Sequence, residues 1–144
     1  FDAPAFAALS DDGQDLPAGC RLVPYDRALV ETAGSVPECW GGVDRFLAEG
    51  VGYVLLSGEE PVSRCHSVFV GDGIAEIGVE TEEAHHRKGC ALRTCRADIV
   101  ACLARGLTPG WSCWDNNAPS VSLAQRLAFR GPTEVPVAIL TRPA

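Results

Sequence analysis

The sequence predicts an α+β protein built on a mostly antiparallel sheet with helices on both of its faces. Three apolar runs of strand length follow one another at 52–57, 62–70 and 74–81, separated only by short glycine-containing turns. Helical periodicity precedes and follows these runs, and neither an internal repeat nor a linker divides the chain. The predicted element order is β-α-α-β-β-β-α-β-α-β. A strand meander flanked by helices is typical of this fold class.

Length and composition fit one ordinary folded domain. The chain has 144 residues, of which 47% are hydrophobic, and 12 Lys and Arg against 19 Asp and Glu give a formal charge of −7. A chain of this size buries a sufficient core without cross-links. The composition excludes an intrinsically disordered segment, and no apolar run approaches the ~18 residues of a membrane span. The acidic balance and the scattered basic residues argue against nucleic acid as a partner.

The beginning of the chain favours a piece of a longer protein, because the sequence contains no Met and starts at Phe1. We expect residues 1–19 to form an N-terminal arm, or the remnant of a preceding region, and residues 20–144 to form a single domain. No segment resembles a secretory signal, so a cytoplasmic location is expected.

The seven cysteines are interpreted mainly as small buried hydrophobic residues. They include no Cys-x-x-Cys pair, and the odd count leaves one unpaired in any disulfide scheme of a monomer. A metal site would use His85, His86, Cys90 and Cys95, which lie within 11 residues of one another. Structural zinc sites pair two close ligands with two distant ones, and the sequence offers no second pair with suitable spacing. The prediction is a reduced protein without a metal.

The predicted elements before the meander are one strand and two helices. A short edge strand is expected at 21–25, where a proline is tolerated. Helices are expected at 26–33 and 38–49, with Gly50 ending the second. The second helix carries apolar residues at helical spacing, namely Trp40, Val43, Phe46 and Leu47.

Helices and strands alternate after the meander. A helix is predicted from about 90 to 104, with an apolar stripe formed by Leu92, Cys95, Ile99 and Cys102. Residues 110–114 are strand-like, and Asn117 precedes a second helix. A closing strand is predicted at 135–140, where Pro136 indicates an edge or a bulge. Such an edge would be able to pair with a second copy of the chain in a homodimer.

Two motifs in this second half resemble those of the GNAT superfamily of N-acetyltransferases. The strand 75–81 and the following His86-Arg87-Lys88-Gly89-Cys90-Ala91 are similar to the family's acyl-CoA signature, in which Arg/Gln-x-x-Gly-x-Gly/Ala opens a long helix. The run from Asn117 to Leu123 resembles the family's second conserved helix, and Ala128-Phe129 resembles its terminal Gly-Phe. The element order also matches over residues 20–140. Residues 111–117 resemble a bacterial subgroup that includes antibiotic self-resistance acetyltransferases.

The resemblance implies an N-acetyltransferase that moves an acetyl group from acetyl-CoA, its co-substrate, to a primary amine of a small molecule or peptide. The amine would attack directly in a ternary complex, within an acyl-CoA N-acyltransferase domain at 20–144. A helix N-terminus offers unpaired N–H groups and a positive dipole end to the CoA pyrophosphate. The residues implied in this contact are His86, Arg87, Lys88, Gly89, Cys90 and Ala91. Taken alone, the same stretch is a loop glycine and a solvated basic face.

The strand before this loop is implied to hold the thioester end of the cofactor. In the family this strand diverges from the next one, which leaves backbone groups free. The resemblance places those groups at Ile77 and Val79, with the Val79 N–H as the oxyanion donor. Asn117 and Ser120, at the start of the second helix, are implied to contact the CoA arm. An ordinary helix cap is the alternative role of Asn117.

An acceptor amine is mostly protonated at neutral pH, so a base has to take a proton before the attack. Glu76 and Glu80 share one face of their strand, with Gly78 between them, and are the predicted catalytic residues. Glu76 is preferred, because the Glu-Ile-Gly stretch resembles one found on this strand in family members. A solvated sheet face is the alternative for both, and His66 is a second candidate base. The acidic chain favours a cationic acceptor.

Two positions depart from the family pattern. His86 stands where Arg or Gln is usual, and Ala124 stands where many members carry a Tyr that acts as general acid. The alternative prediction is therefore a non-catalytic CoA-binding or regulatory domain. Other groups near the site are Ser120, Ser122 and Cys113, and the sequence singles out none of them as the acid. An acceptor pocket would draw on Trp40, Tyr53, Trp111 and Trp114, although buried aromatic residues are more often core.

Overall fold

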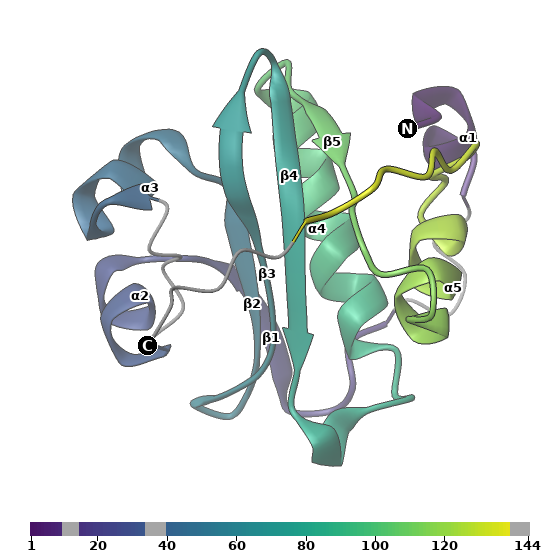
Figure 1. Ribbon diagram of the computed structural model, residues 1–144. Coiled ribbons are helices and arrows are strands. Elements are labelled where there is room, and N and C mark those ends of the chain that lie inside the picture. The colour runs from purple at the N-terminus through teal and green to yellow at the C-terminus, as the bar shows by residue number, and fades with distance from the viewer. Residues whose placement is uncertain (10–14, 34–39, 139–144) are drawn as a thin grey trace, which may run out of the picture.

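The predicted sheet is present and has five strands in the order β1-β2-β3-β4-β5 (Figure 1). The computed structural model describes residues 1–9, 15–33 and 40–138. Neighbouring strands are antiparallel from β1 to β4, and β5 runs parallel to β4. The strands are β1 (Cys20–Pro24), β2 (Gly52–Ser57), β3 (Glu60–Gly71), β4 (Ile74–Thr81) and β5 (Thr108–Gly110). The α+β class and the mostly antiparallel sheet are confirmed.

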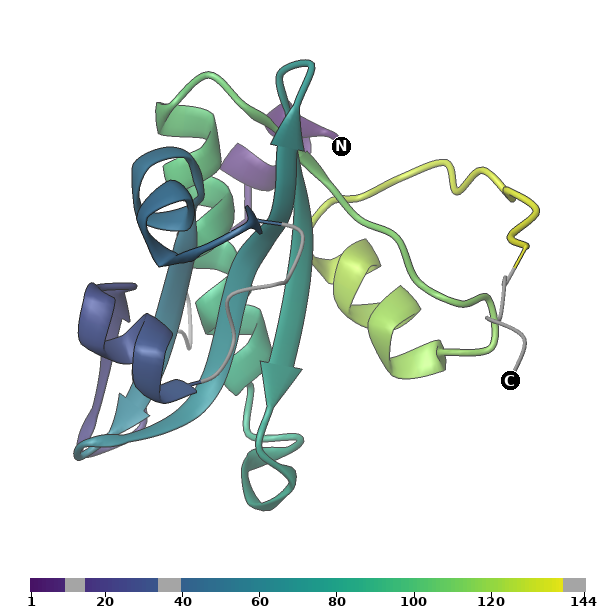
Figure 2. The same ribbon diagram turned by 60° about the vertical axis from the view of Figure 1, so that its left-hand side comes forward.

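Helices lie on both faces of the sheet, as predicted (Figure 1, Figure 2). The long helix α4 (Cys90–Ala104) covers one face, while α2 (Arg27–Ala33) and α3 (Val43–Glu49) lie on the other. A short 3₁₀ helix, η2 (Glu83–His85), joins β4 to α4, and α5 (Ala118–Arg126) follows β5. No helix in the described ranges has the length and apolar composition needed to cross a membrane.

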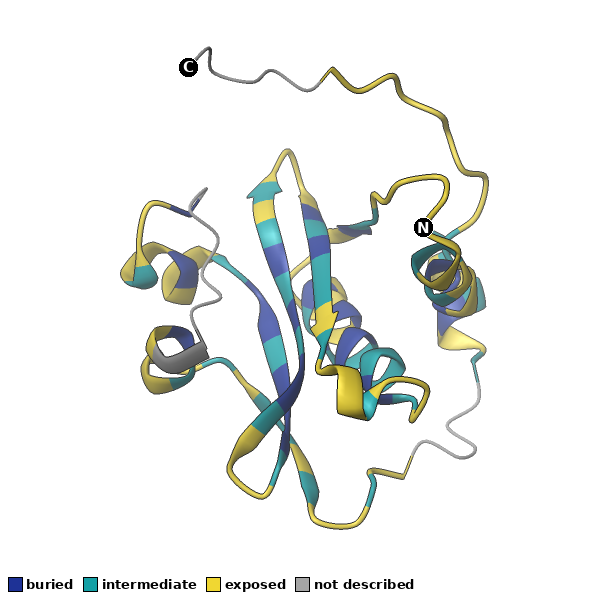
Figure 3. Ribbon diagram, turned by 60° about the horizontal axis from the view of Figure 1, so that its bottom comes forward, coloured by how far each residue is buried: buried dark blue, intermediate teal, exposed yellow. Residues whose placement is uncertain are grey.

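The main core lies between α4 and the strands β3 and β4. The predicted stripe of α4 is confirmed, since Cys95, Ile99 and Cys102 are fully buried and Leu92 packs against the cluster that contains Cys95 and Ile99. Burial alternates along much of β3 and β4, because successive side chains point to opposite faces of the sheet (Figure 3). The cysteines described by the structure carry free thiols, and most of them are buried. Cys39 lies outside the described residues.

The N-terminal stretch contains a short helix, α1 (Ala3–Ala7), where the composition predicts only an arm or loop. The Asp2 side chain caps this helix by accepting the Ala5 N–H at 2.9 Å. Phe6 is buried in the α4 cluster. The Asp2 N–H also donates to the carbonyl of Ala128, just beyond α5, at 3.0 Å. A cap and one buried aromatic residue therefore fix this segment to the domain.

Helix α3 begins at Val43 and not at residue 38 as predicted. Gly41 and Gly42 immediately before it have φ of +67° and +140°, which no helix accommodates. Residues 38 and 39 lie outside the described part of the chain. The apolar spacing extends through these glycines, so the pattern alone placed the helix start too early.

Two strand predictions are wrong in position. Strand β5 ends at Gly110, where the predicted strand 110–114 begins, and residues 111–114 leave the sheet. Residues 135–138 belong to no strand, and Val135 is 71% exposed. Pro136 has no N–H to donate, and β5 offers only a short edge for pairing. The end of the predicted closing strand, 139–140, is not described, and the homodimer expected from this edge stays a prediction.

Candidate active site

The sheet opens between β4 and β5. These strands pair at only three positions, which join Ile74 to Thr108, Ala75 to Pro109 and Glu76 to Gly110. Beyond Gly110 the chain turns away from β4 and runs out to α5 (Figure 2). Among the described residues, β4 therefore has an unpaired edge from Ile77 to Thr81, while its other edge stays paired with β3.

The backbone groups on this open edge belong to Ile77, Val79 and Thr81. In a strand, the N–H and C=O groups of successive residues point to opposite edges. The Glu82 N–H donates to the Val62 carbonyl of β3 at 3.0 Å. Even-numbered residues in this part of β4 therefore face β3, and odd-numbered residues face the opening.

Two contacts on the other side of β4 agree with this assignment. The Thr108 N–H of β5 donates to the Gly73 carbonyl at 2.8 Å. Nε2 of His86 lies 2.8 Å from the Thr81 carbonyl, which can only accept, so Nε2 carries the hydrogen. Both carbonyls belong to odd-numbered residues.

A cleft of about 490 Å³ occupies the opening. One wall is the open edge of β4, and the other is formed by the segment after β5 and by the first turn of α5. Four predicted cofactor-binding residues line it, namely Ile77, Val79, Asn117 and Ser120. Trp111, Cys113 and Trp114 line the second wall. The structure thus gathers at one site residues that lie 40 positions apart in sequence.

The first turn of α5 holds Asn117 and Ser120 together. Asn117 is the N-cap, since its Oδ1 accepts the Ser120 N–H at 3.3 Å. The indole N–H of Trp111 donates to Ser120 Oγ at 3.1 Å. The Trp111 ring packs against Phe129, with 5.4 Å between the ring centroids. One hydrogen bond therefore holds the Ser120 backbone in the cleft wall, and another holds its hydroxyl.

The start of α4 has the features that phosphate binding requires. Gly89 precedes the helix with φ of +75°, a left-handed conformation that glycine adopts without strain. No described side chain caps this end. The first intrahelical bond runs from the Arg93 N–H to the Gly89 carbonyl, so the N–H groups of Cys90, Ala91 and Leu92 lack helical partners. These groups also carry the positive end of the helix dipole.

The other residues predicted for this loop differ in what they offer. Arg87 and Lys88 are exposed and add positive charge. The His86 ring is already bonded to the end of β4. The Cys90 side chain is buried, so only its backbone is available to a ligand. No residue of 86–91 is among those that line the cleft, and the loop begins where the open edge of β4 ends.

The two predicted catalytic carboxylates have different surroundings. Glu76 is half-buried where β4 and β5 part, and a Cβ added at Gly110 would meet its Oε2 at 2.5 Å. Glu80 is exposed and lies opposite Arg64 of β3, which forms an ion pair with Glu82 at 2.9 Å. Neither carboxylate is among the described residues lining the cleft. Glu76 adjoins its closed end, which favours it over Glu80.

His66 lies opposite Gly78, a residue of the cleft wall. Its ring contacts Tyr25 and Phe46 edge-on, at centroid distances of 6.1 and 6.2 Å. Burial lowers the pKa of His66 to about 4, so the imidazole is neutral at physiological pH. A Cβ at position 78 would lie 3.9 Å from Nε2, so the His66 ring lies close to this residue of the cleft wall. His66 remains the second candidate base.

The four aromatic residues considered for an acceptor pocket divide into two pairs. Trp111 and Trp114 line the cleft. Trp40 is a core residue, 3% exposed, whose indole N–H donates to the Ser67 carbonyl at 2.8 Å. Tyr53 lies in a different hollow, beside α4.

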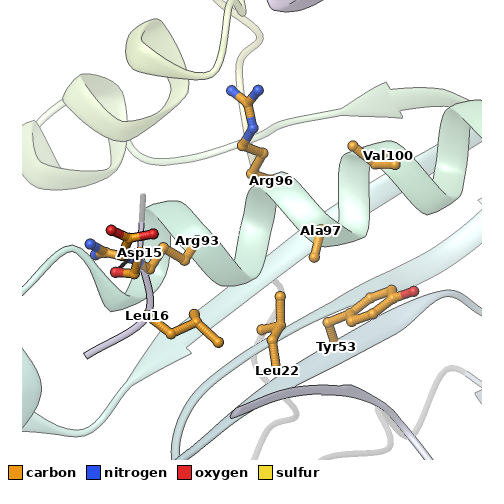
Figure 4. Close-up of a pocket in the computed structure, with 8 residues that line it drawn as sticks. All are labelled: Asp15, Leu16, Leu22, Tyr53, Arg93, Arg96, Ala97 and Val100. Atoms are coloured by element: carbon orange, nitrogen blue, oxygen red, sulfur yellow. Dashed lines mark hydrogen bonds between the residues drawn. The ribbon is translucent and has the colours of Figure 1, made fainter. Parts of the chain in front are cut away.

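That second hollow, of about 530 Å³, lies between α4 and the strands β1 and β2 (Figure 4). Two arginines of α4 reach its rim, and both are engaged by the N-terminal segment. Arg93 Nε donates to the Asp15 carbonyl at 3.1 Å, and Arg96 Nη2 donates to the Leu9 carbonyl at 3.2 Å. These two hydrogen bonds hold the N-terminal segment to α4 at the hollow, which contains none of the predicted catalytic or cofactor-binding residues.

The residues considered for a metal site are not grouped in the described part of the structure. Within the described ranges, no three His, Cys, Asp or Glu side chains are placed to hold a metal ion. His85 ends η2 and His86 follows it in the loop, whereas Cys90 and Cys95 are buried in the core.

A buried carboxylate on α4 was missed by the sequence interpretation. Asp98 is 0% exposed, and burial raises its pKa to about 7, although a hydrogen bond from Cys102 at 3.7 Å partly offsets this rise. Its Oδ1 has no partner among the described residues. Asp98 follows Cys95 by three positions and precedes Cys102 by four, so the apolar stripe itself indicated that this acid is buried.

Comparison with known proteins identifies relatives of this architecture. A family model described as GNAT acetyltransferase matches residues 3–137. The chain is 32% identical over 124 residues to the uncharacterized N-acetyltransferase YdfB of Bacillus subtilis (strain 168). The match covers 83% of this chain and 48% of YdfB, so the chain spans about half the length of this relative.

Solved structures give the same result. A GCN5-related N-acetyltransferase-like protein from Streptococcus suis 89/1591 has a TM-score of 0.73 at 32% identity, over 79% of this chain and 47% of the other. The aminoglycoside N-acetyltransferase AAC(6')-Iy in complex with CoA has a TM-score of 0.66 at 10% identity, over 84% of this chain and 99% of the other. At that identity the likeness to AAC(6')-Iy concerns the fold alone.

Proposed function

This chain belongs to the GNAT acetyltransferase family, and we propose that it transfers an acetyl group from acetyl-CoA to a primary amine of a small molecule or peptide. The amine attacks the thioester directly while both substrates are bound. The observation that carries the proposal is the opening between β4 and β5, where unpaired backbone groups of Ile77 and Val79 line a cleft. The CoA complex of AAC(6')-Iy, which shares this fold, supports acetyl-CoA as the co-substrate.

The start of α4 would hold the pyrophosphate of the co-substrate. Its free N–H groups and dipole attract anions, and Arg87 and Lys88 add charge at the same place. In a chain of net charge −7 this is a local exception to an acidic whole. The pantetheine arm would follow the open edge of β4 from the loop toward Val79, with Asn117 and Ser120 on the opposite wall.

The reacting centre would lie in the cleft. Acetyl-CoA supplies an activated acetyl group there, and the Val79 N–H faces the position of the acyl oxygen as negative charge develops on it. A fixed donor of this kind contributes about 3 kcal/mol to lowering the barrier. Glu76, at the closed end of the cleft, would take a proton from the acceptor ammonium, directly or through a water molecule.

The proposed acceptor is a small cationic amine. The chain is acidic, and its field steers cations toward it. Trp111 and Trp114 offer flat apolar surface beside the proposed position of the thioester. The relative AAC(6')-Iy is named as an aminoglycoside N-acetyltransferase, which supports this class of acceptor.

The test combines a binding assay with a turnover assay on the whole chain. Ligand at about 100 times its Kd stabilises a protein by about 2.7 kcal/mol, which raises the Tm of a domain of this size by roughly 5–10 °C. We expect such a shift with millimolar acetyl-CoA. We also expect CoA release, followed by liquid chromatography, with at least one amine among an aminoglycoside, a polyamine and a lysine peptide.

Each result separates the candidate functions. The absence of any shift at millimolar acetyl-CoA contradicts the proposal. A shift without CoA release from any amine favours a non-catalytic CoA-binding domain, the alternative that Ala124 suggests because it cannot donate a proton.

A further inference from the structure

We propose that Ser120 donates a hydrogen bond to the CoA sulfur as the thioester breaks, an inference that rests on the acetyl transfer proposed above. The leaving group of that reaction is a thiolate, and a donor aimed at it stabilises the developing charge. The sequence alone leaves Ser120, Ser122 and Cys113 as equal candidates. The structure distinguishes them by position and by hydrogen bonding.

Only one of the two serines is part of the site. Ser120 is half-buried and lines the cleft on the wall opposite Val79. Ser122 is exposed and is not among the cleft residues of the described chain. Two positions along a helix correspond to about 200° of rotation, so the two side chains point to different sides of α5.

The hydrogen of the Ser120 hydroxyl is available for donation. The oxygen accepts the Trp111 indole N–H at 3.1 Å, and no acceptor among the described residues takes the hydroxyl hydrogen. The neighbouring backbone N–H is already bonded to Asn117. A hydroxyl that accepts one hydrogen bond is polarised and becomes a better donor of another. Cys113 also lines the cleft, but it is exposed and no described group orients its thiol.

The geometry of α5 explains how the cleft keeps a donor although residue 124 is Ala. Ser120 and Ala124 are four residues apart and lie on the same face of the helix. Helix side chains lean toward the N-terminus, so a long side chain at 124 would extend over the turn that carries Ser120. A hydroxyl at its tip would end close to the position of the Ser120 hydroxyl.

The amine nitrogen bonds to the acetyl carbon, the C–S bond breaks, and the electron pair of that bond stays on sulfur. Two protons leave the ammonium nitrogen in total, of which one passes through Glu76 to solvent and the other reaches the sulfur through water. Ser120 keeps its own proton and contributes a hydrogen bond, because a serine hydroxyl is a far weaker acid than a thiol.

The primary test compares Ser120→Ala with its neighbour Ser122→Ala. A hydrogen bond to a charged group corresponds to a loss of about 10- to 100-fold in kcat when it is deleted. We expect that loss for Ser120→Ala, with the KM for acetyl-CoA within about twofold and the CoA-induced Tm shift retained. Ser122→Ala should behave as wild type, and Ser120→Thr, which keeps the hydroxyl, should keep most of the activity.

Trp111 acts through Ser120 and is a positioning residue. Trp111→Phe keeps an aromatic ring and removes the N–H, and we expect a loss of about three- to tenfold. In a Ser120→Ala background the same change should have almost no effect, because the hydroxyl that Trp111 orients is gone. A purely structural role of Trp111 would give the same loss in both backgrounds.

A hydroxyl placed at position 124 should partly replace that of Ser120. Adding Ala124→Tyr to Ser120→Ala should restore part of the lost kcat. An active wild type with an equally active Ser120→Ala overturns this inference alone, as does Cys113→Ser losing activity where Ser120→Ala does not. A wild type that releases no CoA with any amine overturns the proposed function, and this inference with it.

Discussion

The two edges of β4 differ in how far they are paired. Along β3 the strand is paired over its whole length, from Ile74 to Thr81, whereas along β5 pairing stops at Glu76. Backbone groups of even-numbered residues complete the sheet, while those of Ile77 and Val79 face the cleft. Alternate residues of β4 therefore serve two purposes: one set pairs with β3 and stabilises the sheet, and the other faces the ligand site. Substitutions at neighbouring residues should accordingly affect either stability or activity.

The largest difference is expected from proline at two adjacent positions. Glu80→Pro deletes an N–H that faces β3. Proline is not tolerated where the N–H of the replaced residue pairs with a neighbouring strand, so this variant should fail to fold. Val79→Pro deletes an N–H that faces the cleft and leaves the β3 ladder intact. It should fold with a moderately lower Tm but release CoA about 100-fold more slowly or worse.

Circular dichroism and CoA release measure both effects. Val79→Thr, which keeps the N–H, serves as the control and should stay near wild-type activity. Equal loss of structure in the two proline variants would contradict the assignment of the two edges.

The stability of the core beneath α4 should respond to pH through the buried Asp98 of that helix. Burial raises its folded pKa from 3.8 to about 7, so folding favours the protonated form. The stabilisation is complete below pH 4 and is lost as the pH rises through 7, a change of roughly 4 kcal/mol at most. Asp98→Asn cannot titrate and should be more stable than wild type at pH 8.

Urea unfolding at pH 5 and pH 8 tests this prediction. Wild type should lose more unfolding free energy between these pH values than Asp98→Asn does. Parallel losses in the two proteins would show that another group is responsible.

At the loop end of the open edge, Gly89→Glu should remove the acetyl-CoA-induced Tm shift. The new carboxylate would lie beside the N–H groups that we assign to the pyrophosphate, and binding should weaken by about 100-fold or more. Gly106→Glu is the matched control, because Gly106 has a φ of +71°, close to the +75° of Gly89, at the opposite end of α4. Both variants bear the same charge and a similar left-handed backbone, although only the side chain at 89 would contact the Arg93 guanidinium. The loss of the shift in both would refute the assignment.

The smallest effect on kcat is expected at Glu76, where the pairing of β4 with β5 ends. Glu76→Gln should lower kcat by about tenfold near pH 7, since water can replace part of the function of a general base. Glu80→Gln, on the exposed part of the same face, should change kcat less than twofold. If Glu76→Gln is as active as wild type while His66→Gln is not, the base is His66.

Most of the fold was predictable because its signals are local. Strands β2 and β4 and helix α4 follow from apolar runs bounded by glycine turns, and their ends match the prediction closely. Helix α3 shows the limit of such patterns, because its apolar spacing continues through two glycines that the backbone uses as a break. Residues 135–138 form no strand, because strand formation requires a neighbouring edge to pair with, and local sequence does not report one.

The site was predictable only in part. The motif assigned Ile77, Val79, Asn117 and Ser120, which do line one cleft. Selecting Ser120 over Ser122 required the rotation of α5 and a contact from Trp111, nine residues earlier. The different environments of Glu76 and Glu80 arise from where β5 ends, and no spacing within β4 encodes that point.

The open edge of β4 also bears on how this sequence can change over evolutionary time. It presents main-chain atoms, and every residue except proline supplies the same pair of them. Substitutions at Ile77 and Val79 are therefore limited only by how well the new side chain packs, because the backbone N–H and C=O groups stay the same. Such a stretch can drift far in composition without losing its ligand contacts. The one residue type that these positions have to exclude is proline, which lacks the N–H.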